Sequence, residues 1–490
     1  MTDSNSNYSD LPLGWKIVQL QDIGKIVSGG TPSTKVAEYW EEEICWISPA
    51  DLSGYNQKYI SKGNKSISKF GLENSSAKLM PKGSILFSSR APIGYVAIAS
   101  NSLATNQGFK SIIPNENIFN EYIYYYLKSA KQLAEKHANG TTFKEISAKA
   151  FASLSIPLPP LPEQHRIVEK IEELFSELDN GVASLKKVLE QLKTYRQAVL
   201  KWAFEGKLTE KWRNTHQDSL EDADTLLEQI KAERKRHYQQ QLEDWKQALK
   251  EWENNGKETK KPTKPQQPKD LPPLTKEELS NLPSLPNGWM WVKLEDITNI
   301  TGGIAKNSKR NALSIKLPYL RVANVYANFL DLNEVYEIGL RQEEVEKFLL
   351  VKNDLLIIEG NGSIDQIGRV AIWNDKINPC VHQNHVIKAR PHTNTNPLFS
   401  LYFLLSHQGR KFIKKQAGST SGLYTLSLSK VRNLNIPFCS LQEQTKIVQE
   451  IESRLSVCDQ LEATLTENLD KAEALRQSIL KRAFEGKLVL

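Results

Sequence analysis

Two long segments of the chain carry apolar residues at every third or fourth position, which is the period of a helix with one narrow apolar stripe. The first segment runs from Gln164 to Leu208, and the second runs from Gln444 to Leu488. A stripe this narrow is typical of a coiled-coil seam, so each segment is predicted to form one long helix. The seam positions are Ile167, Ile171, Leu174, Leu178, Val182, Leu185, Leu189, Leu192 and Val199 in the first segment, and Ile447, Ile451, Leu455, Cys458, Leu461, Leu465, Leu469, Ala472, Leu475 and Ile479 in the second.

The two segments are copies of one sequence. They align without a gap at an offset of 280 residues, and both end on the tail Ala-Phe-Glu-Gly-Lys-Leu. Gly206 in the first tail stands where a helix C-terminal cap is expected. Residues 164–201 would form a helix of about 57 Å. Because the copies are equal in length, we expect the two helices to pack antiparallel on each other; the alternative is that each packs on its own domain.

The duplication extends to the globular segments that precede the helices. Residues 11–15, Leu-Pro-Leu-Gly-Trp, return as Leu-Pro-Asn-Gly-Trp at 285–289. Strand-like runs match at 82–88 and 352–358, and again at 93–98 and 367–372. Helical stretches follow at 121–138 and 398–416, and each segment closes on Leu-x-Ile-Pro. The frames agree while the loops differ, as expected for two copies of one scaffold with two binding specificities.

These patterns divide the chain into six parts. They are a disordered N-terminus at 1–10, a globular domain at 11–160, a long helix at 161–208, an insertion at 209–282, a second globular domain at 283–440 and a second long helix at 441–490. The insertion is predicted to hold a helix at 219–253 and a Lys/Pro-rich linker. The predicted fold class is α+β, with two mixed α/β domains held apart by an antiparallel pair of long helices in a pseudo-twofold repeat.

Composition narrows the possible functions. The net charge of +7 permits a polyanionic partner without requiring one. No apolar run is long enough to span a membrane, and the four cysteines lack the spacing of a zinc site, so we expect a cytosolic protein with free thiols. The sequence carries no Walker A motif, because Gly206-Lys207 is followed by Leu208, and it has no Gly-x-Gly-x-x-Gly run that opens a strand-helix unit. It also lacks the Asn/Asp-Pro-Pro-aromatic run that amino-methyltransferases use. We therefore expect a non-catalytic chain that holds no metal or cofactor of its own.

Three features together resemble one known family, the specificity (S) subunit of type I restriction-modification systems. They are the duplicated helices, the run Gly-Lys-Leu-Thr-Glu-Lys-Trp-Arg at 206–213, and the motif Ile-Pro-x-Pro-x-x-x-Glu-Gln at 156–164. The second copy of this motif, at 436–444, has Cys439 in place of the second proline. The resemblance covers nearly the whole chain, and the globular domains are similar to the family's target recognition domains.

The resemblance implies that the two domains read the two halves of an asymmetric, interrupted DNA target, with the helices as a ruler for the gap. It also implies two methyltransferase subunits that bind S-adenosylmethionine, two restriction subunits that use ATP and magnesium, and a cytoplasmic location. Two other readings stay open. The chain is then either a self-contained modification enzyme, or a scaffold whose coiled coil joins two protein-binding domains.

Direct reading of base pairs needs donors and acceptors such as those of Arg, Asn and Gln, which we expect on the loops where the two domains diverge. Small hydroxyl groups beside a glycine turn suit phosphate contacts. The candidates for base contacts are Ser88, Ser89, Arg90, Asn106, Gln107 and Lys110 in the first domain and Glu359, Asn361, Ser363, His382, Gln383, Asn384 and His385 in the second; those for phosphate or flanking contacts are Thr141, Thr142, Ser419, Thr420 and Tyr424.

Overall fold

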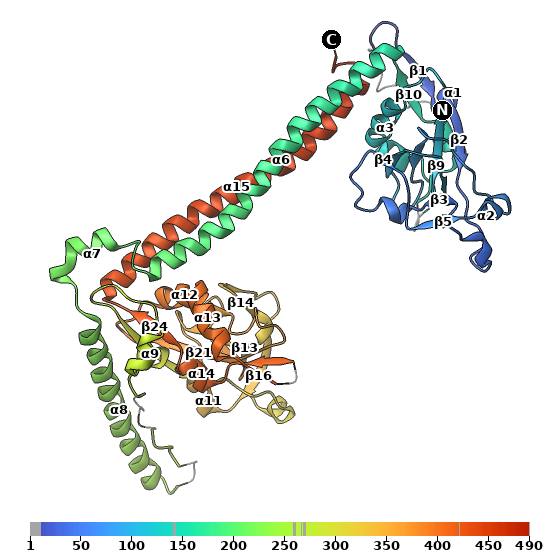
Figure 1. The fold of residues 1–490 in the computed structure, drawn as a ribbon. Helices are drawn as coiled ribbons and strands as arrows, with labels where there is room; N and C mark the ends of the chain where they lie inside the picture. The colour runs from blue at the N-terminus through green and yellow to red at the C-terminus, as the bar shows by residue number, and fades with distance from the viewer. Residues whose placement is uncertain are drawn as a thin grey trace. The chain divides into compact units, whose positions relative to one another are not determined.

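The chain is described by a computed structural model over residues 11–140, 144–257, 261–265, 267, 271–420 and 422–489 (Figure 1). It forms two compact units. The first comprises Met1–Val188 with Thr464–Leu490, and the second comprises Leu189–Ala463. Each unit therefore contains one globular domain and part of both long helices. Within the described residues, none of the helices combines the length and apolarity that a membrane span requires.

The first domain is built on a five-stranded sheet and a three-stranded sheet. The larger sheet has the order β2 (Gly24–Ser28), β9 (Lys110–Pro114), β6 (Ile85–Phe87), β7 (Val96–Ala99) and β4 (Tyr59–Ile60), and the smaller one has the order β5 (Lys65–Ile67), β3 (Ile44–Ile47) and β8 (Ala104–Thr105). Strands β1 (Lys16–Gln19) and β10 (Ser155–Leu158) form a separate antiparallel pair. The helices of this domain are α1 (Leu20–Ile23), α2 (Lys69–Glu73), α3 (Asn120–Ser129), α4 (Lys131–Lys136) and α5 (Ala148–Ala152).

The second domain repeats this arrangement. Its main sheet has the order β12 (Thr298–Thr301), β21 (Val386–Pro391), β17 (Leu355–Ile358) and β19 (Val370–Ile372), and its smaller sheet has the order β16 (Tyr336–Leu340), β13 (Ile315–Leu320) and β20 (Val381–His382). The pair β11 (Met290–Lys293) and β24 (Asn435–Phe438) corresponds to β1 and β10. Further short strands are β14 (Val325–Tyr326), β15 (Phe329–Leu330), β18 (Gly360–Asn361), β22 (Gly418–Thr420) and β23 (Leu423–Thr425), and the helices are α10 (Leu294–Ile297), α11 (Gln342–Phe348), α12 (Pro397–Leu405), α13 (His407–Gln416) and α14 (Leu428–Arg432).

The matched sheet orders confirm that the globular segments are duplicated. One parallel pair is also repeated, since β3 pairs with β8 and β13 with β20 in parallel; the first domain has in addition the parallel pair β4–β7 at the edge of its main sheet. The strands predicted from the apolar runs are present as β6, β7, β17 and β19. The helical stretch predicted at 398–416 is two helices, because the Ser406 hydroxyl accepts a hydrogen bond from the Gly409 amide at 3.1 Å and so caps a new helix.

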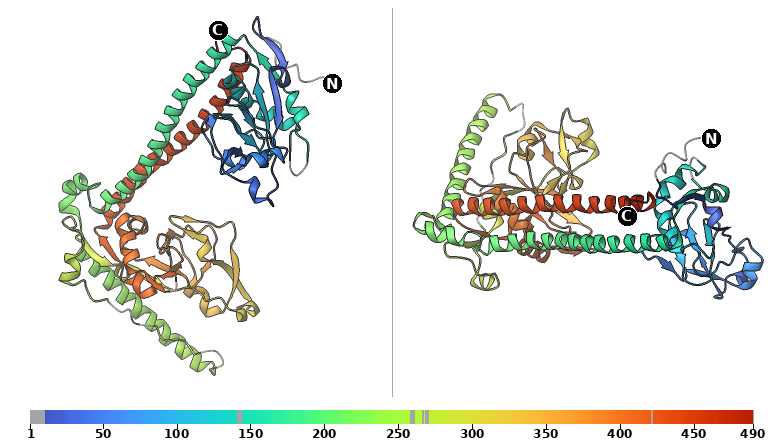
Figure 2. Two further views of the ribbon diagram at one scale, coloured as in Figure 1. Left: turned by 45° about the vertical axis from the view of Figure 1, so that its right-hand side comes forward. Right: turned by 90° about the horizontal axis from the view of Figure 1, so that it is seen from above.

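The two long helices, α6 (Leu161–Phe204) and α15 (Leu441–Phe484), have 44 residues each. They run side by side in opposite directions (Figures 1 and 2), and each is about 66 Å long. Ion pairs between them follow the repeat. In the first unit Arg476 of α15 pairs with Asp179 of α6, and in the second unit Arg196 of α6 pairs with Asp459 of α15. Arg196 and Arg476 are equivalent positions of the repeat, 280 residues apart, and so are Asp179 and Asp459. Each arginine pairs with the aspartate of the other helix, which confirms the predicted antiparallel packing.

The predicted seam is wrong at two positions. Leu461 and Leu475 are 47% and 51% exposed, whereas Ile447, Ile451 and Cys458 on the same helix are buried. Two packed helices cover only a narrow stripe of each other, and these leucines lie beside that stripe rather than on it. Apolar periodicity alone marks a wider face than one partner helix can bury.

The C-terminal end of each long helix inserts into a globular domain. Phe484 packs between Tyr122 and Tyr126 of α3, with ring centroids 5.3 Å from each. Phe204 packs in the same way on Phe399 and Phe403 of α12, at 5.2 and 5.1 Å. The end of the helix that follows the second domain therefore completes the core of the first, and the end of the helix that follows the first domain completes the core of the second.

Each helix end is closed by the predicted glycine cap. Gly206 has a positive φ of +72°, and the Lys207 amide donates to the Trp202 carbonyl at 2.9 Å. Gly486 has a φ of +70° with the matching bond from Lys487 to Arg482. A Cβ atom at Gly206 would lie only 2.3 Å from Pro286, so the close contact with the domain also requires glycine.

The Glu-Gln pair at the start of each long helix ties it to its own domain. Trp15 donates through Nε1 to Glu163 at 3.1 Å, and Trp289 donates to Glu443 at 2.8 Å. The neighbouring Gln164 accepts from the Phe119 amide at 2.9 Å and donates to the Pro159 carbonyl at 3.0 Å. Gln444 bonds in the same way to the Asn396 amide and the Cys439 carbonyl, both at 2.8 Å.

The insertion adds α7 (Glu210–His216), α8 (Ala223–Asn254) and α9 (Lys276–Ser280). The predicted helix starts at 223 because the Asp222 carboxylate caps it, accepting from the Thr225 amide at 2.8 Å. The first turns of α8 pack on the second domain, where Leu226 and Ile230 are buried. Farther along α8, Trp245 donates to the Pro262 carbonyl at 3.0 Å, so the linker folds back on the helix.

The same Glu→Gln substitution at the start of the two long helices should reduce the free energy of unfolding by different amounts. The nearly fully buried Glu443 accepts from Trp289, from Thr209 at 2.8 Å and from Arg213 at 2.7 Å, so Glu443→Gln leaves a partly buried guanidinium without its charge partner. We expect a loss of about 3–5 kcal/mol in the free energy of unfolding. The matched control Glu163→Gln should lose about 1 kcal/mol. Urea unfolding measures both, and equal losses would contradict the distinction between the junctions.

Candidate nucleic-acid interface

Three segments meet at one end of the main sheet in each domain. In the first domain the Ser89 amide, just after β6, donates to the Gly108 carbonyl before β9 at 2.7 Å, and the Ile146 amide donates to the Ser89 carbonyl at 3.0 Å. In the second domain the Glu359 amide, just after β17, donates to the His385 carbonyl at 3.0 Å, and the Leu426 amide donates to the Glu359 carbonyl at 2.7 Å. The same backbone hydrogen bonds therefore bring three equivalent segments together in each domain, although the sequences of these segments differ.

The first domain presents a small charged and amide cluster at this place. Arg90 lies 3.4 Å from Glu145, and its side chain is 39% exposed. Gln107 is exposed and accepts a hydrogen bond from Thr31. The Asn106 side chain accepts from the Gly108 amide at 2.8 Å, which fixes the turn that carries Gln107. Two of the predicted residues, Arg90 and Gln107, therefore offer side chains to a ligand.

Three other predicted residues of the first domain are buried. Ser88 donates to the Pro92 carbonyl at 2.7 Å and accepts from the Tyr95 amide at 2.8 Å, so its hydroxyl shapes the loop. Ser89 is fully buried, and the Lys110 amine lies 3.3 Å from the Gln107 carbonyl and 3.5 Å from Glu145. These side chains support the cluster and do not reach the surface.

In the second domain the structure brings most of the predicted residues together. Asn361 on β18 lies opposite Tyr424 on β23, which lies opposite Ser419 on β22. His385 places its Nδ1 atom 2.8 Å from the Glu359 carboxylate, and Asn384 lies 3.3 Å from the other ring nitrogen. The cluster is a mixture of hydrogen-bond acceptors and donors with one aromatic ring, and its donors and acceptors are the kind of group that can bind base edges.

Other polar groups shape the loops around this cluster. The Asn361 side chain accepts from the Ser363 amide at 2.9 Å, and the Ser363 hydroxyl accepts from the Asp365 amide at 3.3 Å. The Gln383 side chain accepts from the Val322 amide at 3.3 Å and thereby links the β20–β21 loop to the segment before β14. Ser363 nevertheless stays exposed at its turn.

His382 is fully buried, in contrast to the prediction. Its Nδ1 atom lies 2.6 Å from the Val386 carbonyl, and burial lowers the pKa of His382 to about 3, so the ring is neutral at physiological pH. It therefore supports the β20–β21 loop from inside. Over the described ranges, no three His, Cys, Asp or Glu side chains gather in a way that would hold a metal ion.

Part of the predicted set stays a prediction. Thr141 and Thr142 lie outside the described residues, and so does the side chain of Thr420. Ser419 is exposed and Tyr424 is half-buried, both on the β22–β23 hairpin. Their role as phosphate or flanking contacts stays a prediction.

Sequence reasoning missed three arginines around the second cluster. The Arg321 guanidinium lies 3.8 Å from the centroid of the Tyr336 ring, and the Arg369 guanidinium lies 5.0 Å from that of Tyr326. Arg410 on α13 bonds to the turn that contains Ser363. The sequence held a signal for Arg369 alone, since it follows the matched Ile-Gly pair; the other two come from elements that the repeat aligns only loosely.

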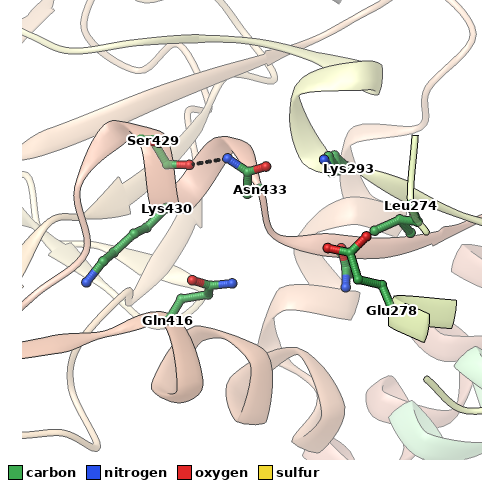
Figure 3. A pocket seen from close by; sticks show the side chains of 8 residues that line it. Leu274, Glu278, Lys293, Gln416, Ser429, Lys430 and Asn433 are labelled. Carbon is green, nitrogen blue, oxygen red and sulfur yellow. Dashed lines mark hydrogen bonds between the residues drawn. The ribbon is translucent and has the colours of Figure 1, made fainter. Parts of the chain in front are cut away.

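A separate polar pocket lies where the insertion meets the second domain (Figure 3). It has a volume of about 340 Å³ and is lined by residues of α9, β11, α13, α14 and β24. Two lysines line it, Lys293 and Lys430. Lys293 donates to the Pro272 carbonyl at 2.8 Å, and Asn433 donates to the Ser429 carbonyl at 2.8 Å. The Lys293–Pro272 bond fastens the insertion to the domain, and none of the predicted base-reading residues lines the pocket.

A family described as "Type I restriction modification DNA specificity domain" matches residues 12–193 and 286–471. The chain is 39% identical over 184 residues to the type I restriction enzyme MjaIX specificity subunit of Methanocaldococcus jannaschii, which covers 37% of this chain and 42% of that relative. It is 24% identical to the type I restriction enzyme EcoKI specificity subunit of Escherichia coli K12, over 98% of this chain and 90% of that relative.

Solved structures have the same fold. A chain from a structure on complex assembly and conformational transition of the type I R-M system matches with a TM-score of 0.63 at 18% identity, over 98% of this chain and 99% of that chain. The HsdS subunit from Thermoanaerobacter tengcongensis matches with a TM-score of 0.55 at 18% identity, over 98% of both chains.

Removing the negative charge of the first cluster should increase its affinity for DNA. Glu145 neutralises Arg90 and Lys110 (Nη1–Oε2 and Nζ–Oε1 distances of 3.4 and 3.5 Å), so Glu145→Gln should raise affinity for non-specific duplex DNA by roughly threefold at low salt, with the gain shrinking as salt rises. Glu116→Gln removes the same charge from an exposed site of the same domain and is the control. Fluorescence anisotropy across a salt series measures both, and equal gains would refute the assignment.

Proposed function

Because this chain belongs to the type I restriction-modification DNA specificity family, we propose that it is the subunit that selects the DNA target of a restriction-modification complex. Each globular domain reads one half of a two-part target, and the paired helices set the gap between the halves. The observation that carries the proposal is the repeated frame with divergent loops at the same end of the same sheet.

The chemistry of the two clusters supports an asymmetric target. The first cluster offers Arg90 and the amide of Gln107, whereas the second offers Asn361, Asn384 and the His385–Glu359 pair. A guanidinium suits guanine, and an amide suits adenine, so the two domains prefer different base pairs. Two domains with the same fold and different recognition side chains select a DNA target whose two halves differ in sequence.

The chemical steps belong to partner subunits in this proposal. Two methyltransferase subunits bind S-adenosylmethionine and modify adenine in each half, and two restriction subunits use ATP and magnesium to cleave unmodified DNA. The chain itself contributes recognition and docking, and it works in the cytoplasm, where the DNA is.

Exposed apolar residues on the long helices supply one docking place in each unit. In the first unit, Leu174, Leu178 and Leu475 line a groove of about 410 Å³ between α6 and α15. The repeat relates Leu475 to Tyr195, which lies in the second unit and is 38% exposed beside the equally exposed Trp202. Exposed apolar patches of this kind mark protein contacts, and two related patches suit two copies of one partner.

A methylation map tests the function. The chain is co-expressed with its methyltransferase in a host without other adenine methylation, and the DNA is sequenced by a method that detects N6-methyladenine. We expect one motif of two unlike halves with a fixed gap. A continuous or palindromic motif would mean that the domains do not read separate halves. No motif with an active partner would favour a scaffold that joins two protein-binding domains, and methylation by the isolated chain would favour a self-contained enzyme.

If each docking place binds one methyltransferase copy, a substitution in either place should weaken the binding of one copy only. A charge in an apolar contact is costly, so Tyr195→Glu and Leu475→Glu should each weaken the binding of one methyltransferase copy by about tenfold or more and leave the other copy bound. Native mass spectrometry counts the bound copies. Gln197→Glu is the control, because it adds the same charge to an exposed position on the opposite face of α6. Retention of two copies by both variants would rule out these docking places.

A further inference from the structure

One turn of the second domain is held in an unusual way. The Arg410 guanidinium of α13 donates to three backbone carbonyls, those of Asp365 and Gly368 at 3.1 Å each and that of Ile367 at 2.7 Å. Lys414, one helical turn later, pairs with the Asp365 carboxylate. Two cations from one helix thus fix the segment between β18 and β19.

The turn is also fixed from within. The Gln366 and Ile367 amides both donate to the Ser363 carbonyl at 3.1 Å, and Ile367 is fully buried in the domain core. Gly368 follows with a φ of +60° and packs closely on α13, where an added Cβ would lie 2.5 Å from Ile413. The backbone of the turn is therefore rigid, while the side chains of Ser363, Asp365 and Gln366 remain exposed.

This turn differs in length between the two domains. Three residues, 90–92, separate Ser89 from Ile93 in the first domain, whereas seven residues, 360–366, separate Glu359 from Ile367 in the second. The extra residues start at β18 and so lie directly beside Asn361 and its partner Tyr424. The second domain therefore has a longer segment here than the first domain.

Burying the charged guanidinium of Arg410 costs free energy, and the stability of the loop alone does not explain why a charged residue is used here. Burial lowers the pKa of its guanidinium, with the exposed Asp365 as the acidic group that offsets the effect. Neutral carbonyls replace water around a charged group only in part, so a smaller uncharged side chain would close the loop at less cost. The planar five-donor fork, however, can hold three carbonyls in one geometry.

We propose that residues 362–366 are a specificity-determining element of the second domain, in which Gln366 contacts a base and Arg410 is the positioning residue that fixes the turn. This inference rests on the proposed function. An amide side chain on a rigid turn offers one donor and one acceptor side by side, which is the pattern that adenine accepts in the major groove. Rigidity matters because a mobile amide would accept several bases equally well.

Methylation mapping of variants tests the inference. Gln366→Ala leaves the exposed turn folded and should make one position in one half of the motif degenerate, with discrimination there reduced about tenfold or more. Arg410→Lys keeps the charge but lacks the planar guanidinium whose two Nη atoms hold the three carbonyls in one geometry, so it should relax the same position while the other half of the motif stays unchanged. Lys411→Gln, on the exposed face of the same helix, should leave the motif intact.

The outcomes separate the inference from the function that it rests on. An unchanged two-part motif with Gln366→Ala overturns the inference and leaves the proposed function standing. Equal relaxation of both halves with Arg410→Lys overturns it as well, because a positioning residue of one turn affects one half only. A wild-type chain that gives no two-part motif overturns the proposed function itself.

Discussion

The insertion of each long helix into the domain of the other repeat is the contact on which the rest of the structure depends. Phe204 and Phe484 complete hydrophobic cores whose other members lie far away in sequence. An aromatic side chain buried in this way contributes about 3–5 kcal/mol, so neither core is complete without both helices. The identical tails fit similar receiving sites: two tyrosine rings of α3 and two phenylalanine rings of α12 accept the same residue, a phenylalanine.

The contacts at both ends of each long helix hold the helices and sheets in the same arrangement in the two halves. The sequence differences between the halves are therefore concentrated in loops that do not make these contacts. The Trp–Glu and Gln contacts are repeated with nearly the same geometry in both halves, and so is the pairing of β6 with β9 and of β17 with β21. The loops that leave those strands carry different residues and different lengths. A new binding preference therefore needs changes only in loops, and a stable frame tolerates them.

The repeat made much of this fold predictable from the sequence. A gapless copy at a fixed offset predicts two helices of equal length, and matched strand runs predict two similar sheets. Burial at single loop residues was not predictable, because Ser88, Ser89 and His382 look like other polar loop residues until their backbone partners are known. Arg410 was hidden for a related reason: its partners are carbonyls, which every residue carries, so no side-chain pattern marks the contact.

The insertion breaks the symmetry of the repeat at one junction. Thr209 and Arg213 follow α6 directly, and both donate to Glu443, whereas the corresponding Glu163 accepts from Trp15. The run Gly-Lys-Leu-Thr-Glu-Lys-Trp-Arg thus has a physical role in this chain, since its threonine and arginine satisfy a carboxylate that the helix end would otherwise bury. The first turns of α8 then pack on the same core. The second domain is consequently fastened to α6 by charge, hydrogen bonds and apolar contacts together.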